Sequence, residues 1–289
     1  MRLCRFGEDR LGLVTNENTV RDVTAALDVL PAWRYPLPSF DPLIAHLDRV
    51  SERIREIAAQ CPEQPLDPDT LLSPIANPGK IIAAPVNYQK HLDEVRGDAQ
   101  LHHGNQAHMA PIHTMGLFLK ASSSLVGPSQ GIHVRMPDRR TDHEVELAVI
   151  IGKQAHMVSA ADALGYVAGY SIGLDITIRG PEDRSFRKSP DSYTVLGPWM
   201  VTADELLDPG SLDLSLTLNG EIKQSSNTRN LILGVPQLIQ WAASFYTLHP
   251  GDVILTGTPA GVSPIVPGDQ VTATIEGIGS MNVAVSAVA

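Results

Sequence analysis

The chain has 289 residues, of which 43% are hydrophobic and 19% are charged, a composition that supports a large packed core and excludes a disordered chain or a coiled coil. Asp and Glu outnumber Lys and Arg by 32 to 22, so the formal net charge is −10. This charge argues against nucleic acid or an anionic membrane as the partner. The two cysteines, Cys4 and Cys61, are too few for a disulfide framework or a cysteine-based zinc site.

Neither membrane insertion nor secretion is expected. The longest apolar run, residues 147–151, is far too short to span a bilayer. The first residues, Met1 to Phe6, lack the apolar region of a signal peptide. We therefore expect a soluble, cytoplasmic protein.

The first part of the chain predicts a small α+β unit. Residues 11–14 and 19–20 alternate around a polar turn, which is typical of a hairpin. Asp41 and Pro42 are suited to the start of a helix. An apolar stripe with helical spacing follows, formed by Leu43, Leu47, Val50, Ile54 and Ile57. Five prolines lie between residues 61 and 78, so we expect a small N-terminal domain over residues 1–73 and a second domain over residues 74–289.

The second part predicts mainly strands. The expected strands cover residues 80–84, 144–151, 166–175, 212–218 and 253–255, and a last hairpin ends near Val285. Asn219-Gly220 is a strong hairpin turn signal. Pro236 opens a helix that runs to about Tyr246. The fold class is therefore α+β and mainly β, with a large β domain that carries few helices.

Two glutamates lie side by side at the start of an apolar strand. Glu144 and Glu146 are two positions apart and point to the same face. Two carboxylates about 4 Å apart repel each other by roughly 4 kcal/mol at an effective dielectric constant near 20, so burying both requires a cation or a proton. A frayed strand end with both side chains in water is the alternative. Asp175, at the end of a glycine-rich strand, adds a third acid, and an all-oxygen site favours Mg²⁺, Mn²⁺ or Ca²⁺.

A possible general base lies further upstream. His91 and Glu94 are three residues apart and share a face if this segment is helical. A carboxylate beside an imidazole fixes its tautomer and raises its basicity, as a water-activating base requires. A solvated surface pair is the alternative, and the spacing alone does not separate the two.

Taken in order, several motifs resemble the fumarylacetoacetate hydrolase superfamily. The similar blocks are Lys80-Ile81-Ile82 with Asn87-Tyr88 and His91, Leu117-Phe118-Leu119-Lys120, Glu144-Val145-Glu146, Gly169-Tyr170 through Asp175 and Arg179, Lys188-Ser189, and Leu255-Thr256-Gly257-Thr258-Pro259. The similarity runs from about residue 79 to 285. Each motif is weak alone, but their shared order is specific.

The resemblance implies a mixed β-roll catalytic domain, a homodimer and a set of site residues. One divalent cation, Mg²⁺ or Mn²⁺ with Ca²⁺ as a further option, would be held by Glu144, Glu146 and Asp175. The catalytic residues would be His91 and Glu94, which activate water, and Lys188, which orients substrate oxygens. The substrate-binding residues would be Tyr88, Arg179, Glu182 and Thr258. In several relatives the water-activating pair lies on a lid, and here residues 91–117 would form it, with His102, His103, His108 and His113.

The implied reaction is divalent-metal-dependent hydrolysis of a C–C bond in a 1,3-diketone or acylpyruvate-type acid, as in the catabolism of aromatic compounds. A metal-stabilised enolate would leave when water, activated by His91 and Glu94, attacks the far carbonyl. Metal-dependent decarboxylation of an oxaloacetate-like 2-oxo acid, or isomerisation or tautomerisation, is the alternative. Glu182 stands where the family often has Gln, which leaves the substrate open. A non-catalytic binding protein is a third interpretation, against which the retention of all these groups argues.

Overall fold

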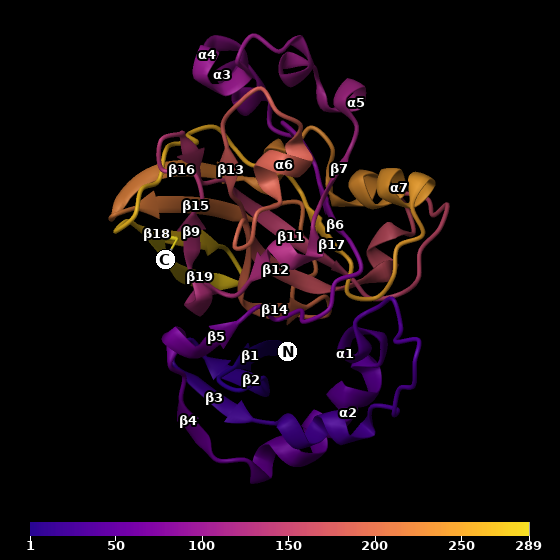
Figure 1. The fold of residues 1–289 in the computed structure, drawn as a ribbon. Helices are drawn as coiled ribbons and strands as arrows, with labels where there is room; N and C mark the ends of the chain where they lie inside the picture. The colour runs from indigo at the N-terminus through magenta and orange to yellow at the C-terminus, as the bar shows by residue number, and fades with distance from the viewer. Residues whose placement is uncertain (289) are drawn as a thin grey trace.

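The computed structural model describes residues 1–288, and the chain begins with a hairpin on which two helices pack. Strands β1 (Arg2–Phe6), β2 (Arg10–Asn16) and β3 (Thr19–Asp22) pair antiparallel in order, as the predicted hairpin requires. Figure 1 shows this part below the remainder of the molecule, with α1 and α2 beside its strands.

The predicted helix after Asp41 is divided into two. Asp41 caps α1 (Pro42–Ala45) by accepting a hydrogen bond from the amide of Ile44, as expected. The amide of His46 then bonds to the carbonyl of Leu43, which tightens the turn and ends α1, and α2 (Leu47–Ile57) begins at the next residue. The apolar stripe nevertheless packs as predicted, because Val50 and Ile54 are fully buried.

One large sheet runs through both parts of the chain. Its main path is β4 (Glu63–Pro65), β3, β2, β1, β14 (Thr194–Thr202), β12 (Val167–Asp175), β11 (Val145–Ile151), β17 (Val253–Leu255), β6 (Ile81–Ala83) and β7 (Phe118–Lys120). Two short strands lie off this path, β5 (Leu71–Leu72) on β1 and β8 (Leu125–Val126) on β14. Strands on both sides of the predicted boundary at residues 73 and 74 thus share one sheet, and the division into two domains stays a prediction.

A second sheet closes the β-rich part. It contains β16 (Glu221–Asn227), β15 (Asp213–Leu218), β18 (Gln270–Ile275), β19 (Gly279–Ala287) and β9 (Ile132–Val134). Asn219 and Gly220 both have positive φ, 53° and 82°, which is why this pair forms the predicted tight turn between β15 and β16. The helix predicted after Gly234 is α7 (Val235–Phe245). The mixed, mainly β architecture expected from the sequence is confirmed.

The segment between β6 and β7 carries short helices on one side of the molecule. These are α3 (Gln89–Gly97), α4 (Ala99–His102) and α5 (Ile112–Met115), which lie above the β-rich part in Figure 1. A two-stranded sheet of β10 (Thr141–Asp142) and β13 (Thr177–Ile178), together with α6 (Arg184–Lys188), lies below them. The candidate site is enclosed between these elements. No helix in residues 1–288 is long and apolar enough to cross a membrane.

Candidate metal centre and active site

Two central strands bring three carboxylates together. Glu144 and Glu146 lie on one face at the start of β11, and Asp175 ends the neighbouring antiparallel strand β12. The amide of Asp175 donates to the carbonyl of Glu144 at 2.9 Å, which places the two side chains beside each other. Each of the three residues offers a carboxylate oxygen within 4.8 Å of the others, and all three are buried. The sequence-based alternative of solvated glutamates is therefore wrong.

Three cations surround two of these acids. Lys188 Nζ donates to Glu144 Oε2 at 2.8 Å and to Asp175 Oδ2 at 2.6 Å. Arg179 donates to Glu144 Oε1 at 2.7 Å. Lys120 Nζ contacts the other oxygen of Asp175 and donates to a backbone carbonyl at 2.9 Å. Glu144 and Asp175 are each paired with two cations, in spite of their burial.

Glu146 differs, since no cation of residues 1–288 forms an ion pair with it. Its carboxylate accepts a hydrogen bond of 2.5 Å from the amide of Gly257. Burial, and then the charges of Asp175 and Glu144, raise the pKa of Glu146 well above its usual value. For Glu144, burial is outweighed by Lys188 and Arg179, which hold its pKa far below the usual range.

The donor set fits a divalent cation. Three oxygen ligands converge, one of them lacks a cation partner, and a hard ion would relieve the repulsion that raises the pKa of Glu146. The buried hydroxyl of Tyr88 also has no hydrogen-bond partner in residues 1–288, and the charge of Glu146 helps to raise its pKa. Both groups are suited to a site that is completed by an ion and its ligands.

A histidine and a glutamate of α3 form the predicted pair. His91 Nδ1 lies 2.7 Å from Glu94 Oε2, and Glu94 Oε1 accepts a hydrogen bond from the amide of Gly261 at 2.9 Å. Because the ionised carboxylate only accepts, Nδ1 carries the proton and the lone pair of Nε2 is left free. His91 is buried and lines the same pocket as the three acids, so the alternative of a solvated surface pair is wrong.

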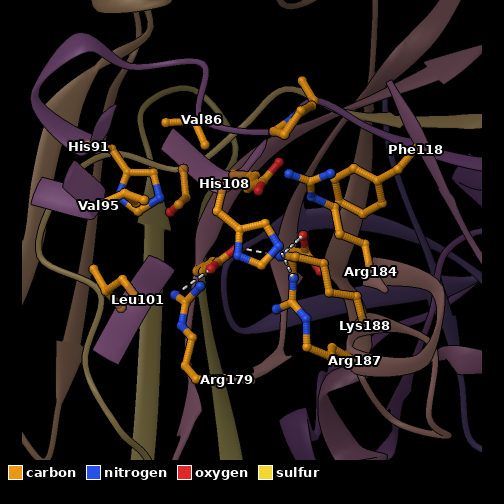
Figure 2. A pocket seen from close by; sticks show the side chains of 16 residues that line it. Val86, His91, Val95, Leu101, His108, Phe118, Arg179, Arg184, Arg187 and Lys188 are labelled. Carbon is orange, nitrogen blue, oxygen red and sulfur yellow. Dashed lines mark hydrogen bonds and ion pairs between the residues drawn. The ribbon is translucent and has the colours of Figure 1, made fainter. Parts of the chain in front are cut away.

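The pocket is closed from above by the lid segment. Figure 2 shows His91, Val95 and Leu101 on one side of the view, with Arg184 and Arg187 on the other. The cavity measures about 50 Å³, whereas small-molecule sites typically provide roughly 300–1,000 Å³. A substrate-sized molecule therefore does not fit this volume unless the pocket lining rearranges.

Two of the expected substrate-binding residues, Glu182 and Thr258, have other contacts, and a third, Tyr88, lies outside the pocket wall. Glu182 is not in the pocket wall, because it forms two hydrogen bonds with Arg139 at 2.8 and 2.7 Å, which lower its pKa to about 2. Tyr88 lies near Glu146 but is also outside the wall. Thr258 lines the pocket, yet its hydroxyl proton goes to the carbonyl of Val145 at 2.9 Å. Their roles toward substrate stay predictions.

Two pocket residues, Arg184 and Arg187, were not predicted as site residues. Lys120 and Phe118, which were named only within a similar motif block, and His108, which was named only within the lid, also lie in or against the site. The sequence signal for Arg184 and Arg187 is the clustering of positive charge in residues 184–188. This segment forms α6, with Asp183 as its N-cap. Lys120 lies in a block that resembles the family, but its role depends on its long-range contact with Asp175, which no local pattern predicts.

Comparison with known proteins agrees with this geometry. The family described as fumarylacetoacetate (FAA) hydrolase C-terminal matches residues 80–286. A maleylpyruvate hydrolase from Aquipseudomonas alcaligenes is 56% identical over 288 residues, with 100% of both chains covered. A mitochondrial oxaloacetate tautomerase from Rattus norvegicus is 36% identical, with 84% of this chain and 80% of the relative covered.

Solved structures extend the likeness to the whole fold. The crystal structure of a maleylpyruvate hydrolase from a Sphingobium species, in complex with manganese (II) ion and pyruvate, superposes with a TM-score of 0.84. It is 38% identical in sequence, and 100% of both chains is covered.

Proposed function

Since this chain belongs to the fumarylacetoacetate hydrolase family and is a divalent-metal-dependent C–C bond hydrolase of the acylpyruvate type, we propose that its substrate is maleylpyruvate. The full-length identity of 56% to a maleylpyruvate hydrolase supports this substrate. Hydrolysis between the two carbonyl-bearing halves would release maleate and pyruvate.

One arrangement carries the proposal: the pair of His91 and Glu94 faces the same closed pocket as Glu144, Glu146 and Asp175. Hydrolysis requires both an activated water and a means of stabilising the carbon that leaves. Decarboxylation or tautomerisation does not necessarily require water activation. The pair, with its buried imidazole, therefore favours hydrolysis over these alternatives.

A divalent ion held by Glu144, Glu146 and Asp175, with Mn²⁺ or Mg²⁺ preferred, supplies Lewis-acid polarisation of the oxo-acid oxygens and stabilises negative charge during C–C cleavage. His91 Nε2 takes a proton from water while Glu94 holds Nδ1 and stabilises the imidazolium. The water oxygen forms a bond to the far carbonyl carbon. The C–C bond then breaks and its electron pair stays with the CH2 carbon of the pyruvate half. That carbon takes the proton back from the His91 imidazolium and becomes the methyl group of pyruvate.

The cations of the site have complementary tasks. Lys188 donates to Glu144, Asp175 and the hydroxyl of Thr177, the last at 2.6 Å, so it fixes the orientation of two proposed ligands. With an ion present, the same ammonium group is close enough to orient substrate oxygens. Arg179 bridges Glu144 and Asp142 and keeps the first carboxylate in place.

The test is a spectrophotometric assay with maleylpyruvate. We expect the enol absorbance of maleylpyruvate to fall in the presence of Mn²⁺ and EDTA to abolish this fall. Maleate and pyruvate should form in equal amounts. The Glu146→Gln variant provides the inactive control. Loss of absorbance without release of pyruvate would indicate tautomerisation, and no loss with metal shown to be bound would overturn the proposed substrate.

We further propose a homodimer in the cytoplasm. Met157, Leu164 and Phe245 expose 68%, 39% and 72% of their surface, and the amide of Met157 bonds to α7, which carries Phe245. A neighbouring group of exposed apolar side chains supports a protein contact. Both cysteines are free thiols, the state that the cytoplasm maintains. Light scattering after gel filtration tests the dimer, and a monomeric mass would contradict it.

A further inference from the structure

Two arginines of α6 enter the pocket without an acidic partner. Arg187 is buried and Arg184 is partly buried, and both line the cavity beside the three acids (Figure 2). Within residues 1–288, neither guanidinium forms an ion pair with a carboxylate. The nearby acids are paired elsewhere, Glu182 with Arg139 and Glu144 with Arg179 and Lys188.

The contacts that the two guanidiniums do make are weak or neutral. Arg184 donates to the sulfur of Met115 at 2.8 Å and lies 5.7 Å from the centre of the Phe118 ring. Arg187 donates to the carbonyls of Glu182 at 2.8 Å and Ile178 at 3.2 Å. These bonds orient both groups, but none of them is an ion pair with a carboxylate of residues 1–288.

Burying these two guanidiniums is energetically unfavourable. Burial, and then repulsion from Arg179 and Arg184, lower the pKa of Arg187 to about 10. Burial also lowers the pKa of Arg184, and the charges of Asp183, Glu144 and Asp175 only partly oppose this. Both remain charged at neutral pH, so the pocket holds two adjacent cations that form no ion pair with a carboxylate of residues 1–288. An anionic ligand group supplies the missing partner, and the planar fork of arginine is suited to a carboxylate.

We propose that Arg184 and Arg187 form a second anion subsite, which binds the carboxylate at the acyl end of a dicarboxylic acylpyruvate. The proposal rests on the proposed function, because it assumes that the oxo-acid end of the substrate lies at the three carboxylates. It predicts that the enzyme selects acyl groups that end in a carboxylate over acyl groups that end in a methyl group.

His108 of the lid occupies the subsite in the closed structure. Its Nε2 lies 3.5 Å from Arg187 and accepts a hydrogen bond from this guanidinium. Burial, and then the charges of Arg187 and Arg184, lower the pKa of His108 to about 4, so the ring is neutral and can accept. The neutral imidazole of His108 thus occupies the position that we propose for the ligand carboxylate.

A matched pair of unreactive ligands tests the subsite without turnover. 2-Oxoheptanedioate has the chain length of maleylpyruvate but lacks the second carbonyl, and 2-oxoheptanoate differs from it only by a terminal methyl group. Isothermal titration of the Mn²⁺-loaded enzyme is expected to show that the diacid binds at least about tenfold more tightly, a difference of about 1.4 kcal/mol. Equal affinity of the two ligands for the wild-type protein would overturn the proposal.

The Arg184→Met variant locates the effect. Methionine keeps an apolar side chain but removes the charge, so the preference for the diacid is expected to disappear while 2-oxoheptanoate binds as before. Arg53→Met, which changes an exposed arginine of α2 paired with Glu56, is the control and keeps the preference. If Arg184→Met weakens both ligands equally, the guanidiniums serve the oxo-acid end and the proposal is wrong.

These titrations separate the subsite from the proposed reaction. If the enzyme does not hydrolyse maleylpyruvate, the preference for the diacid and its loss in Arg184→Met are still measurable. Conversely, hydrolysis of maleylpyruvate with no preference between the two ligands would support the proposed function and refute the subsite.

Discussion

The carboxylate of Glu94 connects His91 to the amide of Gly261, with Oε2 on the imidazole at 2.7 Å and Oε1 on the amide at 2.9 Å. This bridge joins α3, which carries the proposed base, to the loop that follows β17. Val95 and Leu101 pack against Val262 at the same place. The contacts that hold the lid segment against this loop therefore also orient the base.

Replacement of His91 is expected to separate catalysis from metal binding. In His91→Ala the water loses its base, so kcat falls by about 10²–10⁴-fold. Affinity for Mn²⁺, measured by calorimetry, stays essentially unchanged, because His91 is not among the three acids. Asp93→Asn, on the exposed side of the same helix, is the control and keeps full activity. Parallel loss of activity and of Mn²⁺ affinity in His91→Ala would show that the histidine is a ligand.

Replacement of Glu146 by Gln is expected to remove metal binding but not the fold. Loss of a ligand charge weakens Mn²⁺ binding by at least about 100-fold, since even residues behind the ligands contribute about 10–100-fold. Glutamine resembles the protonated acid that burial and the charges of Asp175 and Glu144 favour. Metal-free Glu146→Gln should therefore unfold at the same urea concentration as the metal-free wild type, or at a higher one. Glu221→Gln, at an exposed strand end, is the control; unchanged Mn²⁺ affinity in Glu146→Gln would refute the ligand assignment.

Gly257 is expected to be required for its backbone position and its lack of a side chain. Its φ is +98°, and a Cβ atom would lie 2.6 Å from the Cβ of Asn87. Gly257→Ala should destabilise the protein by more than the roughly 1 kcal/mol that strained φ values cost, and it should weaken Mn²⁺ binding by displacing the amide that holds Glu146. Gly268→Ala is the matched control, because Gly268 has a similar φ of +100° but no atom lies within 4 Å of its added Cβ. Equal urea midpoints for the two variants would argue against a steric role.

His108 predicts a specific dependence of stability on pH. Its pKa is lowered from 6.5 to about 4 by burial and by Arg187, Arg184 and His103, so the unfolded chain binds more protons between these values. Stability from this residue is present above pH 6.5 and is lost as the pH falls toward 4, by up to about 2 kcal/mol at pH 5. The His108→Gln variant should lose less free energy of unfolding between pH 7 and pH 5 than the wild type. Identical losses in urea titrations would contradict this.

Local pattern was sufficient to predict much of the secondary structure. The turn at Asn219 and Gly220, the cap at Asp41 and the strands that carry the acids depend on the preferences of adjacent residues. The prediction of one continuous helix after Asp41 was wrong. The helix breaks at His46, where a backbone hydrogen bond to Leu43 ends α1, and hydrophobic periodicity does not encode this bond.

The sequence by itself determined that Glu144 and Glu146 share a face, because strand geometry alternates side chains. The spacing of His91 and Glu94 places them on one face only if the segment is helical, which the structure confirms. Only the tertiary structure decided which cations meet which acids. Lys120 from β7 and Lys188 from α6 both reach Asp175, whereas Arg184 and Arg187 form no ion pair with a carboxylate of residues 1–288. These pairings depend on strands and loops that are distant in the chain and become neighbours only when the sheet is assembled, so no local spacing contains them.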